Sequence, residues 1–122
     1  MLGYVTLGTN DLARATAFYD KLCAEFGVSR MMETDEFIAW GTPGGGCGIA
    51  LTKPFDGKAA TVGNGVMAAF QAKDQAQVDK VYALAIELGA QDEGPAGPRG
   101  DSGFYAGYFR DPDGNKLNVF CM

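Results

Sequence analysis

The first half of the chain changes its hydrophobic spacing from strand-like to helical and back again. Val5 to Gly8 is a short β-type run, and Asn10 or Asp11 follows as a helix N-cap. Apolar residues then recur at helical spacing until Gly27, a residue suited to end a helix. Strand-like segments follow at residues 28–32, 37–40 and 48–52, separated by Gly and Pro. The pattern predicts one strand, one helix and three further strands.

The second half repeats this order. Residues 66–70 form a strand candidate, Asp74 is placed to cap the next helix, and Gly89 to end it. The apolar stripe of that helix consists of Val78, Val81, Tyr82, Ala85 and Leu88. Short strands follow, and the chain closes with strand candidates at 104–110 and 116–120 around a turn at 111–115.

Equivalent landmarks lie at nearly one offset in the two halves, which predicts an internal duplication. Asp11 and Asp74 are 63 residues apart, and Gly27 and Gly89 are 62 apart. We expect a single α+β domain over residues 1–122, made of two βαβββ modules at about 1–53 and 65–122 with a linker at about 54–64. Two such modules side by side would form a curved eight-stranded sheet around a cup, with the helices on its outer face.

Composition and charge narrow the class of protein. The 122 residues are 47% hydrophobic and 20% charged, with a formal net charge of −5, as in an ordinary globular domain. The Lys and Arg residues are scattered, so we expect no nucleic-acid binding. No apolar run approaches a bilayer span, and the N-terminal segment has no signal-peptide pattern, so we expect no membrane association. The three cysteines form no disulfide framework, which favours a cytoplasmic protein.

The chain contains no histidine. Ser-His-Asp and Cys-His nucleophilic sites are therefore excluded. The most common neutral metal ligand, which is also the usual general base near neutral pH, is absent as well.

Three segments resemble the vicinal oxygen chelate superfamily, which includes glyoxalases, bleomycin-resistance proteins and dioxygenases. They are residues 5–12 (VTLGTNDL), residues 17–20 (AFYD) and residues 108–117 (YFRDPDGNKL). Together with their order and spacing they cover nearly the whole chain and suggest a small single-domain member. The resemblance indicates a fold and not an activity, because this superfamily spans several reactions as well as metal-free binding proteins.

The resemblance also implies four positions where metal-dependent members carry His or Glu. In this chain they fall on Tyr4, Ala50, Met67 and Asn118. Ala has no donor atom, Met offers a soft thioether, and neutral Tyr and Asn are poor ligands for divalent ions. We therefore expect no metal and no other cofactor, in contrast to the enzymes of this superfamily.

The last predicted hairpin supplies candidate ligand-binding residues. If Arg110 pairs with Lys116, then Tyr108 lies opposite Asn118 and Ala106 opposite Phe120. Phe104, Tyr108, Asn118 and Phe120 would then face the cup, where Tyr4, Ala50 and Met67 are also expected. Either these side chains line a site for a partly apolar or aromatic molecule, or they fill a closed core.

Two further residues are candidates with open alternatives. Trp40, the only tryptophan, would either stack on a ligand or pack in the core. Residues 95–103 are rich in Gly and Pro and would form a flap over the cup, from which Arg99 could meet an anionic ligand.

These observations favour a small-molecule binding protein that works without metal and forms a homodimer. One alternative is a superfamily lyase, isomerase or dioxygenase-type enzyme that uses non-metal acid-base groups such as Tyr4 and Tyr108. Another is a structural or regulatory dimer module. The sequence does not decide whether the chain is an enzyme.

Overall fold

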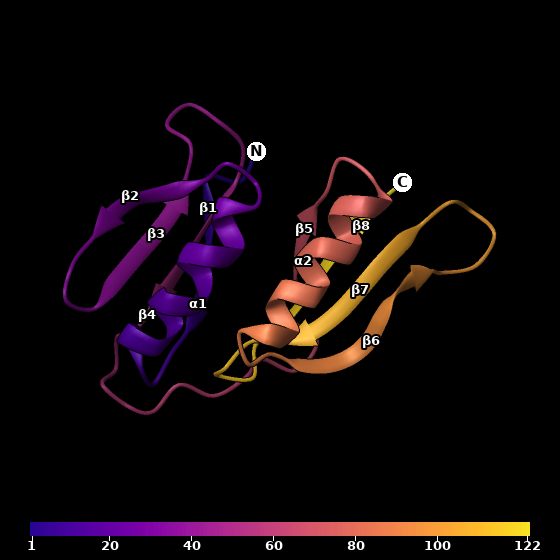
Figure 1. Cartoon of the computed structure of the whole chain (residues 1–122). Coiled ribbons are helices and arrows are strands. Elements are labelled where there is room, and N and C mark those ends of the chain that lie inside the picture. The colour runs from indigo at the N-terminus through magenta and orange to yellow at the C-terminus, as the bar shows by residue number, and fades with distance from the viewer. The chain divides into compact units, whose positions relative to one another are not determined.

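The computed structural model describes all 122 residues and divides them into two compact units, Met1–Val62 and Gly63–Met122. Each unit has one helix and a four-stranded sheet, in the order strand, helix, strand, strand, strand (Figure 1). The predicted α+β class with two βαβββ modules is confirmed.

The first unit contains β1 (Tyr4–Gly8), α1 (Leu12–Ala24), β2 (Ser29–Glu33), β3 (Phe37–Gly41) and β4 (Gly48–Thr52). The second unit contains β5 (Ala68–Gln71), α2 (Gln75–Glu87), β6 (Gln91–Pro98), β7 (Tyr105–Arg110) and β8 (Lys116–Cys121).

The two sheets have the same topology. Their strand orders are β1-β4-β3-β2 and β5-β8-β7-β6, and in each the first strand runs parallel to the last one in sequence. The remaining pairs are antiparallel. Thr6 pairs with Ala50 in the first unit, and Ala69 pairs with Asn118 in the second. Ala50 and Asn118 therefore occupy equivalent places in the two sheets.

Both helices have an aspartate as N-cap: Asp74 as the sequence predicts, and Asp11 out of the two candidates left open for the first helix. The Asp11 carboxylate accepts a hydrogen bond from the Arg14 backbone N–H at 3.0 Å. Asp74 accepts one from the Gln77 N–H at 2.8 Å. Asn10, the alternative cap, instead exchanges two hydrogen bonds with the backbone of Ala60, so part of the predicted linker is held against the first unit.

Each helix covers one face of its own sheet with aromatic and aliphatic side chains. In the first unit Tyr19 of α1 packs on Trp40 of β3, with ring centroids 5.6 Å apart. In the second unit Tyr82 of α2 lies edge-on to Phe109 of β7 at 6.3 Å. Gly107 lies directly under Tyr82, because a Cβ at this position would be 2.8 Å from the tyrosine ring. Odd-numbered residues of β7 thus face α2.

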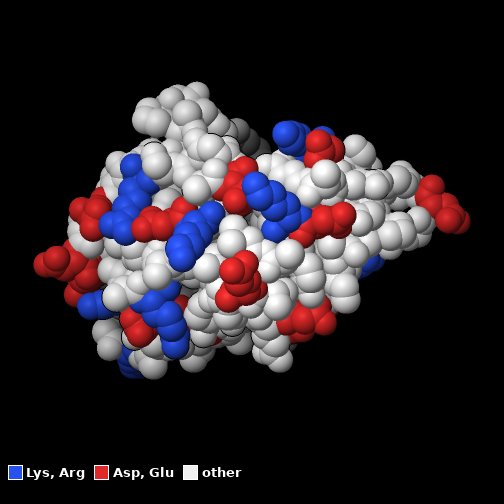
Figure 2. Space-filling model, viewed as in Figure 1, with Lys and Arg blue, Asp and Glu red and all other residues white.

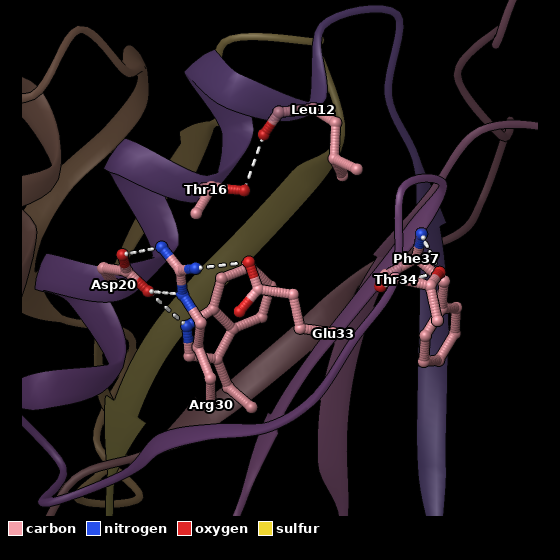
Figure 3. A network of polar contacts seen from close by, with 8 residues as sticks. Leu12, Thr16, Asp20, Arg30, Glu33, Thr34 and Phe37 are labelled. Carbon is pink, nitrogen blue, oxygen red and sulfur yellow. Dashed lines mark hydrogen bonds and ion pairs between the residues drawn. The ribbon is translucent and has the colours of Figure 1, made fainter.

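An ion-pair network ties α1 to β2 and β3 (Figure 3). Arg30 donates to both carboxylate oxygens of Asp20, at 2.9 and 2.6 Å, and to Glu33 at 3.0 Å. The indole N–H of Trp40 also donates to Asp20, at 2.8 Å. The hydrogen bond from Arg30 lowers the pKa of the Asp20 carboxyl against the opposing effect of burial, and the bond from Trp40 lowers it further.

The Asp20 network predicts a pH-dependent contribution to stability. A carboxyl whose folded-state pKa is depressed stabilises the fold above its unfolded pKa, and this effect is lost as pH falls through the folded pKa. We expect Asp20→Asn to lower the melting temperature at pH 7, and the gap from the wild type to shrink as the pH falls below the ordinary aspartate pKa of about 3.9. Thermal unfolding across this range measures the difference. A gap between the two proteins that stays constant with pH would contradict the assignment, and Asp35→Asn is the control because Asp35 lies outside this network.

Neither helix is long and apolar enough to cross a lipid bilayer. On the face shown in Figure 2, acidic and basic side chains lie beside one another, and no continuous basic stripe is visible there. The expectation that the chain does not bind nucleic acid stays a prediction.

Candidate functional site

The face of the second sheet that points away from α2 carries most of the predicted ligand-binding residues. Arg110 pairs with Lys116, Tyr108 with Asn118, and Ala106 with Phe120, so the predicted hairpin register is confirmed. Since Gly107 and Phe109 face α2, the alternation of side chains along the strands places Tyr108 and its partner Asn118 on the opposite face. We call this surface the β7–β8 face.

Three chemical zones follow one another along the β7–β8 face. Phe120 stacks with Phe104 at one end, with ring centroids 5.4 Å apart. Asn118 and Tyr108 form the middle, and Lys116 and Arg110 the other end. Same-face neighbours on a strand are about 7 Å apart, so an apolar, a polar and a cationic zone lie within the length of a small molecule.

Two cations lie over the ring of Tyr108. The Arg99 guanidinium carbon is 5.4 Å from the ring centroid, and the Lys116 ammonium nitrogen is 5.8 Å from it. The side chain of Arg99 also donates to the backbone oxygens of Gly97, Pro98 and Pro95. Arg99 is therefore fixed to its own segment, while Lys116 is a flexible amine at the same ring.

The cationic end of the face is only partly neutralised. Glu93 is 2.8 Å from Arg110 and 3.7 Å from Lys116. The hydrogen bond from Arg110 lowers the pKa of the Glu93 carboxyl, so that this group is ionised at neutral pH. Arg110 and Lys116 thus share the single carboxylate of Glu93 at this end of the face.

Asn118 is the polar centre of the β7–β8 face, and its side-chain oxygen lacks a hydrogen-bond partner. Its exposed fraction is 2%, and no donor lies within reach of its Oδ1. A buried carbonyl oxygen without a donor costs free energy, and each such group in a native fold requires an explanation. The sequence places Asn118 in the site but gives no signal that its oxygen is unsatisfied, because that depends on every neighbouring side chain.

The predicted flap is shorter in the structure than in the sequence analysis. Pro95 to Pro98 belong to β6, whose pairing with β7 is interrupted by register shifts between Asp92 and Gly97. The loop between the strands starts at Arg99, whose backbone N–H donates to the Phe104 oxygen at 2.8 Å. A role for this loop in ligand binding stays a prediction.

The equivalent face of the first unit is apolar. Tyr4 has an exposed fraction of 59% and meets Phe37 edge-on, with centroids 6.1 Å apart, whereas Ala50 is fully buried. Met31 and Met32 are both exposed on this face, because a register shift in β2 lets Met32 pair with Ala39 while Met31 lies over Gly41. The sequence analysis missed both methionines, since a strand without a bulge would turn one of them away.

Trp40 lies on the other side of that sheet. Its exposed fraction is 1%, it packs on Tyr19 of α1, and its indole N–H is bonded to Asp20. The sequence left open whether Trp40 stacks on a ligand or packs in the core. In the structure it packs in the core.

The four positions at which the resemblance implies metal ligands carry a phenol, a methyl group, a thioether and an amide. Met67 precedes β5 and has an exposed fraction of 41%. Asn118 is buried, and its amide oxygen is the only hard donor among the positions of the second unit. No three His, Cys, Asp or Glu side chains converge as a metal site requires. The residues present do not fit a divalent metal ion.

The three cysteines are free thiols. Burial raises the pKa of the Cys23 thiol to about 12, and the nearby charge of Asp20 acts in the same direction. Cys121 is also buried, and Cys47 is exposed. None of the three has the surroundings of an activated nucleophile.

Comparison with known proteins decides the family. The model of the Glyoxalase/Bleomycin resistance protein/Dioxygenase superfamily matches residues 1–119. The chain belongs to this superfamily. None of the curated proteins matches the chain.

Solved structures of the superfamily have the same fold. A glyoxalase/bleomycin resistance protein from Albidiferax ferrireducens T118 is 32% identical, with a TM-score of 0.90 over 100% of this chain and 98% of that one. A glyoxalase-related enzyme from Fulvimarina pelagi is 22% identical, with a TM-score of 0.79 over 100% and 88%. Lactoylglutathione lyase from Agrobacterium tumefaciens is 24% identical, with a TM-score of 0.72 over 99% and 92%. The last two show a common fold only.

Proposed function

We propose that this superfamily member binds a small, partly apolar or aromatic molecule without a metal ion. The observation that carries the proposal is the β7–β8 face, where an aromatic pair, a buried amide oxygen without a donor and the cations Lys116 and Arg110 follow one another. A few polar groups among aromatic side chains are typical of small-molecule sites.

The donor chemistry supports the absence of metal in this function. A phenol, a methyl group, a thioether and an amide replace the ligands that the superfamily resemblance implies. An uncharged amide at position 118 can instead recognise an organic ligand through a hydrogen bond.

We also propose that the protein is cytoplasmic and forms a homodimer. The free thiols of Cys23, Cys47 and Cys121 suit a cytoplasmic protein. The exposed edge strand β2 could pair with a second copy in a homodimer, because its outer backbone groups have no strand beside them.

A thermal-shift screen of small aromatic compounds, run with and without a strong chelator, tests this function. We expect at least one compound to raise the melting temperature by the same amount under both conditions, because binding to the folded state alone stabilises it. Stabilisation that disappears with the chelator and returns on adding a divalent metal would contradict the proposal.

A further inference from the structure

The amide oxygen of Asn118 and the ammonium group of Lys116 restrict the kind of ligand that the β7–β8 face can hold. This inference rests on the proposed function, because it assumes that a small molecule binds there, and it specifies the chemistry of that molecule. The face of the first unit, with its exposed methionines, carries no comparable restriction because no buried side-chain oxygen or nitrogen there lacks a partner.

The Asn118 oxygen requires a donor. It is buried, it lies on the β7–β8 face beside Tyr108, and no protein group donates to it. A ligand N–H or O–H that reaches this oxygen would satisfy it, whereas a ligand with only acceptors or apolar atoms would leave it unsatisfied. The site therefore discriminates between ligands by the presence of a donor.

Lys116 supplies the charge selectivity. Its ammonium nitrogen lies over the Tyr108 ring, back toward the Tyr108–Asn118 pair, and its ion pair with Glu93 is long at 3.7 Å. Glu93 is held mainly by Arg110 at 2.8 Å. Lys116 can thus move from the ring onto a ligand carboxylate by side-chain rotation, while Arg99 stays on the ring through its bonds to backbone oxygens.

The stacked pair Phe104 and Phe120 determines where the aromatic part of the ligand binds. Phe104 and Phe120 stack at the end of the face opposite Lys116, and Phe120 is two residues from Asn118 on β8. An aromatic ring packed against this pair would place the next few atoms of the ligand beside Asn118.

We infer that the β7–β8 face binds an aromatic carboxylic acid that carries an N–H or O–H donor between its ring and its carboxylate. The ring packs on Phe104 and Phe120, the donor bonds to the Asn118 oxygen, and the carboxylate pairs with Lys116. The order of the three groups in the ligand follows the order of the three zones on the protein.

Three matched probes test this order by isothermal titration calorimetry. Phenylacetylglycine has the ring, the amide N–H and the carboxylate. Phenylacetylsarcosine replaces the N–H with N–CH3, and phenylacetylglycine methyl ester removes the charge. We expect affinity to fall about 5- to 10-fold without the donor, as for the loss of one buried hydrogen bond. We expect a fall of about 5-fold without the charge, smaller in high salt.

Protein variants assign each loss to its residue. In Asn118→Leu the N–H and N–CH3 probes should bind equally, since the acceptor that distinguishes them is gone. In Lys116→Met the acid and its ester should bind equally. Lys80→Met removes the same charge from an exposed position on α2, which covers the opposite face of the sheet, and should leave all three affinities unchanged.

The outcomes separate this inference from the proposed function. If the three probes bind the wild type with equal affinity, the inference is overturned and aromatic binding stands. If neither the probes nor any compound of the aromatic screen binds, both fail. The probe series on the wild type decides the matter even if Asn118→Leu does not fold.

Discussion

Asn118→Leu is expected to raise the melting temperature of the unliganded protein. Leu has nearly the branching pattern of Asn. The substitution removes an oxygen that has no hydrogen-bond donor, in a residue that is only 2% exposed. Burial of such a group without a hydrogen bond costs about 1–3 kcal/mol. For a chain of this length, a gain of about 1 kcal/mol corresponds to roughly 4 °C.

Differential scanning calorimetry on the wild type and Asn118→Leu measures this gain. Asn115→Leu is the matched control, because the Asn115 side chain bonds to Asp111 at 3.0 Å and its backbone N–H bonds to the same carboxylate. That substitution should lower the melting temperature. A marked loss of stability in Asn118→Leu would mean that the amide has a structural role and would remove the reason to treat it as a ligand contact.

Trp40→Ala is expected to destabilise the protein by about 4 kcal/mol, the range for removing a large aromatic residue from a core. Trp40 is 1% exposed, packs on Tyr19 and donates to Asp20. The substitution leaves a cavity beneath α1 and removes one bond from the Asp20 carboxylate. Urea unfolding followed by circular dichroism measures the change without using the lost tryptophan.

Two further variants serve as comparisons for Trp40→Ala. Trp40→Phe keeps an aromatic ring but loses the donor to Asp20, so its cost should be clearly smaller than that of Trp40→Ala. Tyr4→Ala removes an aromatic residue that is 59% exposed and should cost under about 1 kcal/mol. If Trp40→Ala were nearly neutral for stability but weakened ligand binding, the assignment of Trp40 to the core would be wrong.

Much of the fold follows from local signals in the sequence. The cap Asp74 is correct, and Asp11 is one of the two candidates for the first helix, because a carboxylate before a helical apolar stripe satisfies N–H groups that nothing else can reach. The register of β7 and β8 is correct because a tight turn fixes which residues pair.

The features that the sequence analysis assigned wrongly or left open have a common physical cause. Each of them depends on residues that are distant in the sequence. Ile38 to Trp40 are all apolar, so alternation could not assign Trp40 to the α1 side. The Gly and Pro residues of segment 95–103 suggested a flap, yet Pro95 to Pro98 belong to an edge strand with bulges, which tolerates both residue types. The hydrogen bonds from the Arg99 side chain to backbone oxygens, and the unsatisfied oxygen of Asn118, depend on how the sheet packs. The sequence alone does not predict them.

The central claim is that the neutral oxygen and sulfur groups at Tyr4, Met67 and Asn118 cannot retain a divalent ion. The metal content of the purified protein tests this claim most directly. Protein expressed with added zinc, nickel, manganese and iron would be analysed by inductively coupled plasma mass spectrometry after removal of loosely bound ions. The account predicts well below one metal ion per chain for every element. One tightly bound ion per chain, lost on substitution of Asn118, would contradict it.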